Sequence, residues 1–120
     1  MILTTETLLD TTVYGTASGN YDGSSQDFLS SVVRGVNYYQ GQGSIQTVTI
    51  QVEGFVGRIR LQASLNDEPV GAVWFEVYDY DRTSPTTDLH PVSLVGNYVW
   101  MRAEITDFSA GTIQTISINY

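Results

Sequence analysis

Two residue types with distinctive chemistry are missing from this 120-residue chain, which contains no cysteine and no lysine. Without cysteine there is no disulfide, no thiol nucleophile and no thiolate metal site, and the redox compartment is left open. Without lysine there is no Schiff-base nucleophile and no phosphate-binding P-loop lysine. Several common kinds of catalytic centre are thereby excluded.

Positive charge is also scarce, because five arginines face thirteen acidic residues and the formal net charge is -8. A protein that binds nucleic acid needs cations to neutralise phosphates, and an acidic protein is repelled by anionic membrane surfaces. Residues 1–10 hold Glu6 and Asp10, no cation and no long apolar run. This pattern is unlike a signal peptide or a transmembrane segment. The sequence predicts a soluble protein with neither nucleic acid nor membrane as a partner.

Alternating apolar and polar residues, separated by turn-forming residues, dominate the chain. Hydrophobic residues make up 42% of it, enough for one core and a single domain over residues 1–120. No long window has a helical period. The expected strands are 7–14, 28–36 (a strand or one helical turn), 45–52, 55–64, 72–80, 92–95, 98–106 and 112–120. About eight such strands predict an all-β fold, a single-domain antiparallel β-sandwich that is jelly-roll-like.

The clearest alternation lies in the middle of the chain. In residues 45–52, Val48, Ile50 and Val52 fall on one face, and Gly54 then breaks the run. In residues 55–64 the apolar face holds Phe55, Ile59, Leu61 and Ala63, with Arg58, Arg60 and Gln62 opposite. Each segment is predicted to be a half-buried strand. Residues 15–27, 37–44 and 81–91 are expected to be loops.

His90 is the only imidazole in the chain, so a Ser–His–Asp triad would have to use it with Asp88 and Ser93. These three residues crowd one short expected loop, whereas a triad needs three separate elements that converge. His90 is therefore interpreted as a solvated loop histidine. The sequence predicts no catalytic residues and no enzyme.

Acidic residues allow two further site hypotheses. Glu76, Asp79, Asp81 and Asp88 are candidates for calcium, which needs six to eight oxygen ligands, but the EF-hand spacing is absent. Pairs among Glu53, Glu76 and Glu104 are candidates for glycoside hydrolysis, but so small a sandwich has little room for a deep cleft. A solvated strand-to-loop transition explains the first group, and charges on an outer sheet face explain the second. No metal or cofactor is expected.

Aromatic side chains are the best candidates for ligand or interface contacts. Tyr38 and Tyr39 lie together in a glycine-punctuated segment, and Trp74 and Trp100 lie in expected strands among polar residues. Rings flanked by polar groups suit both sugar stacking and protein interfaces. The alternative for the two tryptophans is that both plug the ends of the core. The candidate ligand or interface contacts are Tyr38, Tyr39 and Trp100.

The edges of the expected sheet supply an argument for assembly. All-β monomers protect edge strands with lysine, proline or inward charge. This chain has no lysine, and its three prolines fall in expected turns or loops. The first and last expected strands are nearly uncharged. Either acidic charge elsewhere keeps copies of the protein apart, or neighbouring subunits cover these strands. The sequence favours the second explanation, a homo-oligomer.

The carboxy-terminal half carries a family resemblance, in the segments FVGRIRLQASLNDEP, WFEV and GNYVWMRAEITDFSAGTIQTISINY. From about Phe55 to Tyr120 the chain resembles small β-sandwich proteins of tailed-bacteriophage virions. Galactose-binding-like sandwiches share part of this spacing of motif residues. Residues 1–44 have no counterpart in the resemblance, and residues 1–10 are a candidate extended amino-terminal arm.

The resemblance implies a non-enzymatic structural role in a phage virion, in head decoration, neck, tail or fibre, with copies of the chain or other virion proteins as partners. On this resemblance, six residues are framework positions and not part of a site: Ser64, Trp74, Gly96, Tyr98, Arg102 and Gly111. The alternative is a carbohydrate-binding module that uses exposed tyrosine and tryptophan rings.

Overall fold

The computed structural model describes residues 5–35, 45–66, 68 and 73–120, and these form an all-β domain. Four short strands come first: β1 (Thr5–Leu9), β2 (Thr12–Val13), β3 (Phe28–Leu29) and β4 (Val33–Arg34). Three long strands follow: β5 (Ile45–Ser64), β6 (Phe75–Val95) and β7 (Trp100–Asn119). All belong to one antiparallel sheet in the order β1-β7-β5-β6, and β2, β3 and β4 also pair with β7.

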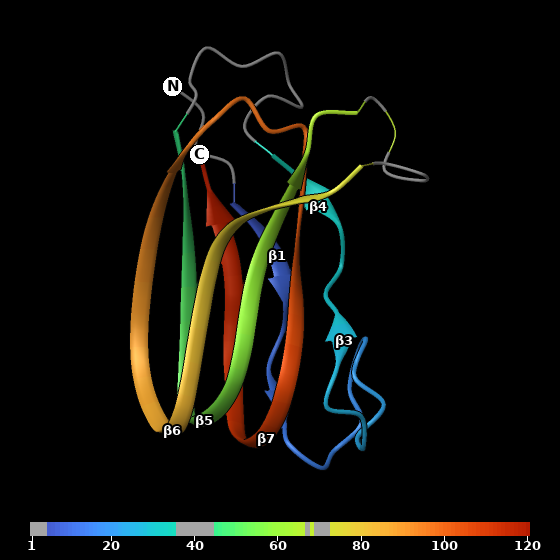
Figure 1. Ribbon diagram of the computed structural model, residues 1–120, viewed down its shortest axis with the longest axis vertical. Helices are drawn as coiled ribbons and strands as arrows, with labels where there is room; N and C mark the ends of the chain where they lie inside the picture. Colours follow the sequence, from blue (N-terminus) through green and yellow to red (C-terminus); the bar gives the residue numbers. More distant parts are fainter. Residues whose placement is uncertain (1–4, 36–44, 67, 69–72) are drawn as a thin grey trace.

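Each long strand is bent back on itself. Twenty residues of straight strand would span about 66 Å, but the longest extent of the molecule is only 39 Å. Figure 1 shows β5, β6 and β7 running down the view, turning near its lower end and returning. The single sheet is thereby folded into two layers.

The first layer holds residues 5–9, 12–13, 45–53, 86–95 and 112–119, and the second holds 28–29, 33–34, 58–64, 75–82 and 100–106. The two layers consist of eight straight segments, which we call arms and number in chain order. β1 and β2 together form one arm, β3 and β4 together form the next, and the bend divides each long strand into two arms. The pairings place them as 1-8-3-6 in one layer and 2-7-4-5 in the other, which is the strand order of a jelly roll. The predicted fold class is confirmed.

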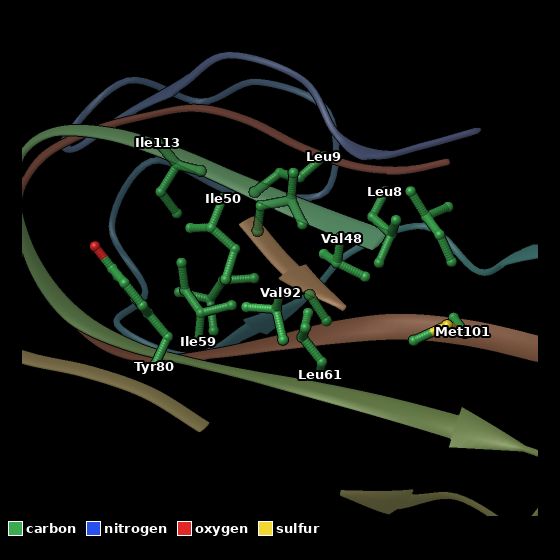
Figure 2. Close-up of a cluster of buried hydrophobic side chains, with 14 of the residues drawn as sticks. Leu8, Leu9, Val48, Ile50, Ile59, Leu61, Tyr80, Val92, Met101 and Ile113 are labelled. Atoms are coloured by element: carbon green, nitrogen blue, oxygen red, sulfur yellow. The ribbon is translucent and has the colours of Figure 1, made fainter. Parts of the chain in front are cut away.

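The core lies between the two layers. Val48, Ile50 and Val52 point into it from the first layer, and Ile59 and Leu61 point into it from the second. Figure 2 shows these contributions meeting, with Tyr80 and Met101 among the second-layer side chains and Val92 and Ile113 among those of the first. Both predicted faces of residues 45–64 are confirmed, because every residue assigned to the core is at most 1% exposed.

The bends explain why Gly54 does not end the strand. Gly54 and Gly111 have φ angles of 62° and 86°, a left-handed conformation that glycine adopts without strain. The sheet register shifts between Val52 and Phe55, which moves the buried positions from even to odd residue numbers. The expected break at Gly54 and the expected gap between the strands 98–106 and 112–120 are instead bends within continuous strands.

An aromatic cluster fills the bent end of the sandwich. Phe108 is fully buried, and its ring centroid lies 5.3 Å from that of Tyr21, 5.5 Å from Tyr14 and 5.7 Å from Phe55. The Phe108 N–H donates to the Gln26 carbonyl at 3.0 Å. Residues of the amino-terminal third therefore close this end of the core.

Two predictions about edges and loops are wrong. The last expected strand lies in β7, which is an interior strand with β5 on one side and β1 to β4 on the other. Residues 81–91 are part of β6, an edge strand that contains Pro85 and Pro91. Proline is tolerated in edge strands and protects them from further pairing. The argument from unguarded terminal strands therefore fails, although β1 does lie at an edge.

Candidate interaction surfaces

The selected aromatic residues fall in different parts of the structure. Tyr38 and Tyr39 lie outside the described residues. Trp100 is half-buried at the start of β7, where it pairs with Ser64 of β5 and Arg34 of β4. Its neighbour Met101 is fully buried, so Trp100 lies on the outward side of the second layer.

The outward side of the second layer carries rows of opposite charges. We call this surface the charged face; its charged residues are Arg34, Arg58, Arg60, Glu76, Asp79, Asp81, Arg102 and Glu104. Arg60 lies between two carboxylates, with Glu104 Oε1 at 3.0 Å from Nη1 and Glu76 Oε1 at 3.4 Å from Nε. These contacts join β6, β5 and β7 across the sheet. Glu76 and Glu104, a candidate pair for glycoside hydrolysis, therefore both contact Arg60 on the outward side of the sheet and do not face a cleft.

Arg58 and Asp79 form a second cross-strand pair on the charged face. The Arg58 Nε–H donates to Asp79 Oδ1 at 2.8 Å, and Nη2 contacts Oδ2. The hydrogen bond from Arg58 lowers the pKa of Asp79, and the same contact raises the pKa of Arg58. Both side chains are about one-third exposed, so solvent weakens the pair.

Tryptophan and arginine stack on the same face. The Arg102 guanidinium carbon lies 4.3 Å from the ring centroid of Trp74, and the Arg102 Nε–H donates to Gln62 Oε1 at 2.7 Å. This combination of cation–π contact and hydrogen bond orients the guanidinium plane. Trp100 follows the same alternation as Arg102, so both tryptophans belong to the charged face.

The outward side of the first layer has a different composition. Its side chains alternate with buried ones; they are Thr5, Thr7, Ile45, Thr47, Thr49, Gln51, Leu89, Pro91, Ser93, Val95, Thr115, Ser117 and Asn119. None of these is charged, and we call this surface the uncharged face. Glu53 continues the same alternation in β5 and lies beyond them at the bend, where Gln114 contacts its carboxylate. Ile45, Leu89 and Val95 are 60%, 61% and 71% exposed. Ile45 and Val95 are direct cross-strand partners.

The two arms of β6 are tied together by polar side chains. Tyr78 Oη lies 2.7 Å from His90 Nε2, and the Tyr80 hydroxyl donates to Asp88 Oδ2 at 3.2 Å. Tyr80 is buried, which raises the pKa of its hydroxyl. The Arg82 guanidinium carbon lies 4.0 Å from the Tyr80 ring centroid. This cluster closes the β6 side of the sandwich between the layers.

The residues of the candidate Ser–His–Asp triad do not all lie on the same side of β6. His90 contacts Tyr78 and faces the inner side of β6, whereas Ser93 lies on the outward face with its Oγ 3.2 Å from Thr47 Oγ1. The expectation of a solvated loop histidine is wrong, because His90 is a half-buried strand residue. The sequence pattern does not indicate this placement, because Pro85 and Pro91 are typical of loops.

The acidic candidates do not converge either. Asp79 points outward to Arg58, whereas Asp88 accepts a hydrogen bond from Tyr80 on the inner side. Glu53 lies at the bend of β5, where Gln114 Nε2 donates to its carboxylate at 3.3 Å. In the described part of the chain, no group of three acidic or histidine side chains is placed to hold a metal ion.

A shallow hollow of about 160 Å³ lies beside β1, lined among others by Asp10, Thr11, Asn20 and Ser31. Pockets for small molecules are typically about 300–1,000 Å³.

The described residues include no helix long and apolar enough to cross a membrane. Comparisons with protein-family models, curated proteins and solved structures gave no match.

Proposed function

We propose that this domain is a non-enzymatic structural protein that assembles with copies of itself as a component of a tailed-bacteriophage virion. The virion assignment rests on the resemblance of residues 55–120 given above. Jelly-roll sandwiches serve as capsid and lectin domains, but a fold by itself does not determine a function. The assembly role therefore needs support from the surface.

The uncharged face is the observation that carries the assembly role. Two copies that each carry a net charge of -8 repel one another wherever their acidic residues meet. A sheet face on which the ionised side chain, Glu53, lies only at the bend reduces that local repulsion. It also exposes three large aliphatic side chains, Ile45, Leu89 and Val95, to which a protein partner can pack.

The polar side chains support a structural role as well. Arg58 and Arg60 are engaged with carboxylates, Arg102 with Gln62 and Trp74, and His90 with Tyr78. These groups link strands to one another and do not converge on a cavity. Their arrangement is that of a scaffold whose outer surfaces make the contacts.

The test is sedimentation equilibrium of the purified chain from about 10 μM to 1 mM. We expect the average mass to rise with concentration above the 13.2 kDa of one chain. A single species of one-chain mass across the whole range would contradict self-assembly. The measurement is repeated at low and high salt, because screening reduces repulsion between acidic copies and should favour association.

Carbohydrate binding is a second candidate, favoured by the two tryptophans on the charged face. The Trp74 ring is held by Arg102, and Gln62 and Glu104 lie near as hydrogen-bonding groups on the same face. Such a surface suits the stacking of a sugar ring. A glycan array with the wild type and the Trp74→Ala variant tests it; binding lost in the variant would support this function, and no binding by the wild type would contradict it.

A further inference from the structure

We infer that the uncharged face is the self-association surface, and that two copies stack through it about a two-fold axis. This inference rests on the proposed assembly function and names the surface involved. In a two-fold contact the same patch serves both partners, so the patch has to be compatible with itself. The composition of the face is the first argument for that compatibility.

Electrostatics favour a second copy as the occupant. Stacking this face on itself places hydroxyl, amide and aliphatic groups opposite the same kinds of groups. A strongly charged partner would find little to pair with there, because Glu53 lies only at the bent end of this side. Stacking the charged face on itself would compete with ion pairs that Arg58 and Arg60 already make within one copy. The uncharged face is thus the sheet surface with the least electrostatic cost for self-contact.

The aliphatic side chains define where the contact is tightest. Leu89 and Val95 lie on β6, with Pro91 and Ser93 between them on the same side, and Ile45 lies opposite Val95 on β5. This apolar row runs along one margin of the face. Thr49 of β5 and Ser117 of β7 are cross-strand partners nearer its middle and supply hydroxyl groups. Sheets that pack face to face keep their strands within about 30° of each other.

The area of the face sets the expected strength. Four strands about 4.8 Å apart, each about seven residues long at ~3.3 Å per residue, cover roughly 19 by 23 Å. Two stacked copies then cover roughly 900 Å² in flat area, below the about 1,200–2,000 Å² of stable complexes. The isolated contact is therefore weak, and many simultaneous contacts in a symmetric particle would strengthen it. Association is expected at tens to hundreds of micromolar.

The experiment compares matched substitutions by sedimentation equilibrium. Leu89→Glu places a charge on the uncharged face, and Leu29→Glu makes the same change at a 41% exposed leucine on the outward side of the second layer. Both variants alter net charge equally. We expect Leu89→Glu to weaken association at least tenfold and Leu29→Glu to leave it unchanged. Thermal melting checks that both variants are folded.

A third variant separates face stacking from edge pairing. Thr49→Glu changes the middle of the uncharged face on β5, an interior strand. Face stacking predicts a loss of association in this variant as large as that in Leu89→Glu. If Thr49→Glu associates like the wild type, or if Leu29→Glu weakens association as much as Leu89→Glu, the surface assignment is wrong while self-assembly stands. A wild-type chain that stays monomeric would overturn both.

Discussion

Gly111→Ala tests whether the close approach of two bends holds the folded sheet together. Gly111 lies in the bend of β7 at a φ of 86°, and a Cβ atom built there would be 2.2 Å from the Gly54 carbonyl oxygen in the bend of β5. That atom belongs to the backbone and cannot rotate away. Alanine at this position therefore has to force the two bends apart or change the backbone conformation.

Gly15→Ala is the matched control, because Gly15 has the same φ of 86° but nothing within 4 Å of its added Cβ. The left-handed conformation alone costs a non-glycine residue about 1–2 kcal/mol. Forcing extra volume into a packed site costs about 1–3 kcal/mol more. We expect Gly15→Ala to lower the free energy of unfolding by about 1–2 kcal/mol, and Gly111→Ala to lower it by about 2–5 kcal/mol.

Urea denaturation followed by tryptophan fluorescence measures both free energies of unfolding on the same scale. The difference between the variants isolates the contact between the bends, since the backbone cost is shared. Equal losses in the two variants would refute the claim that this contact constrains the fold. A loss in Gly111→Ala that is smaller than that in Gly15→Ala would refute it as well.

Two further predictions concern the amino-terminal third and its contacts. Phe108→Ala removes the fully buried ring of the aromatic cluster and should lower the free energy of unfolding by about 3–5 kcal/mol. The Tyr14 residue is 43% exposed, so Tyr14→Ala should lower the free energy of unfolding clearly less. Equal losses for the two variants in urea denaturation would contradict the packing argument. Hydrogen bonds from Ser25 and Ser24 lower the pKa of Asp22 to about 2, so its stabilising contribution is present above the ordinary pKa and is lost as the pH falls toward 2. Ser25→Ala should raise that pKa toward 3.8 in a carboxyl NMR titration, and an unchanged value would contradict the role of Ser25.

The sequence was informative wherever structure depends on alternation along one strand. Val48, Ile50, Ile59 and Leu61 were assigned to the core from their spacing, and all are fully buried. Arg58 and Arg60 were assigned to the outer face, where they form ion pairs. Side chains of a strand alternate between two sides regardless of what the strand pairs with, so this information is local.

Strand pairing was not accessible in the same way. Residues 81–91 look like a loop, because two prolines and several small polar residues interrupt the apolar pattern. They form the bend and the return arm of β6 because this strand is at an edge, where proline removes no interior ladder bond. The contact of Tyr78 with His90 depends on that bend, and no spacing of residues in the sequence indicates it.

By itself, then, the amino-acid sequence determined the all-β class, the two faces of β5 and the shortage of cations. The tertiary structure alone decided which strand lies at the edge, how the three long strands bend together, and that ion pairs gather on the outward side of one layer while uncharged side chains cover most of the outward side of the other. The physical reason is that alternation acts between neighbours in the chain, whereas edges, bends and whole faces arise only when distant segments pair.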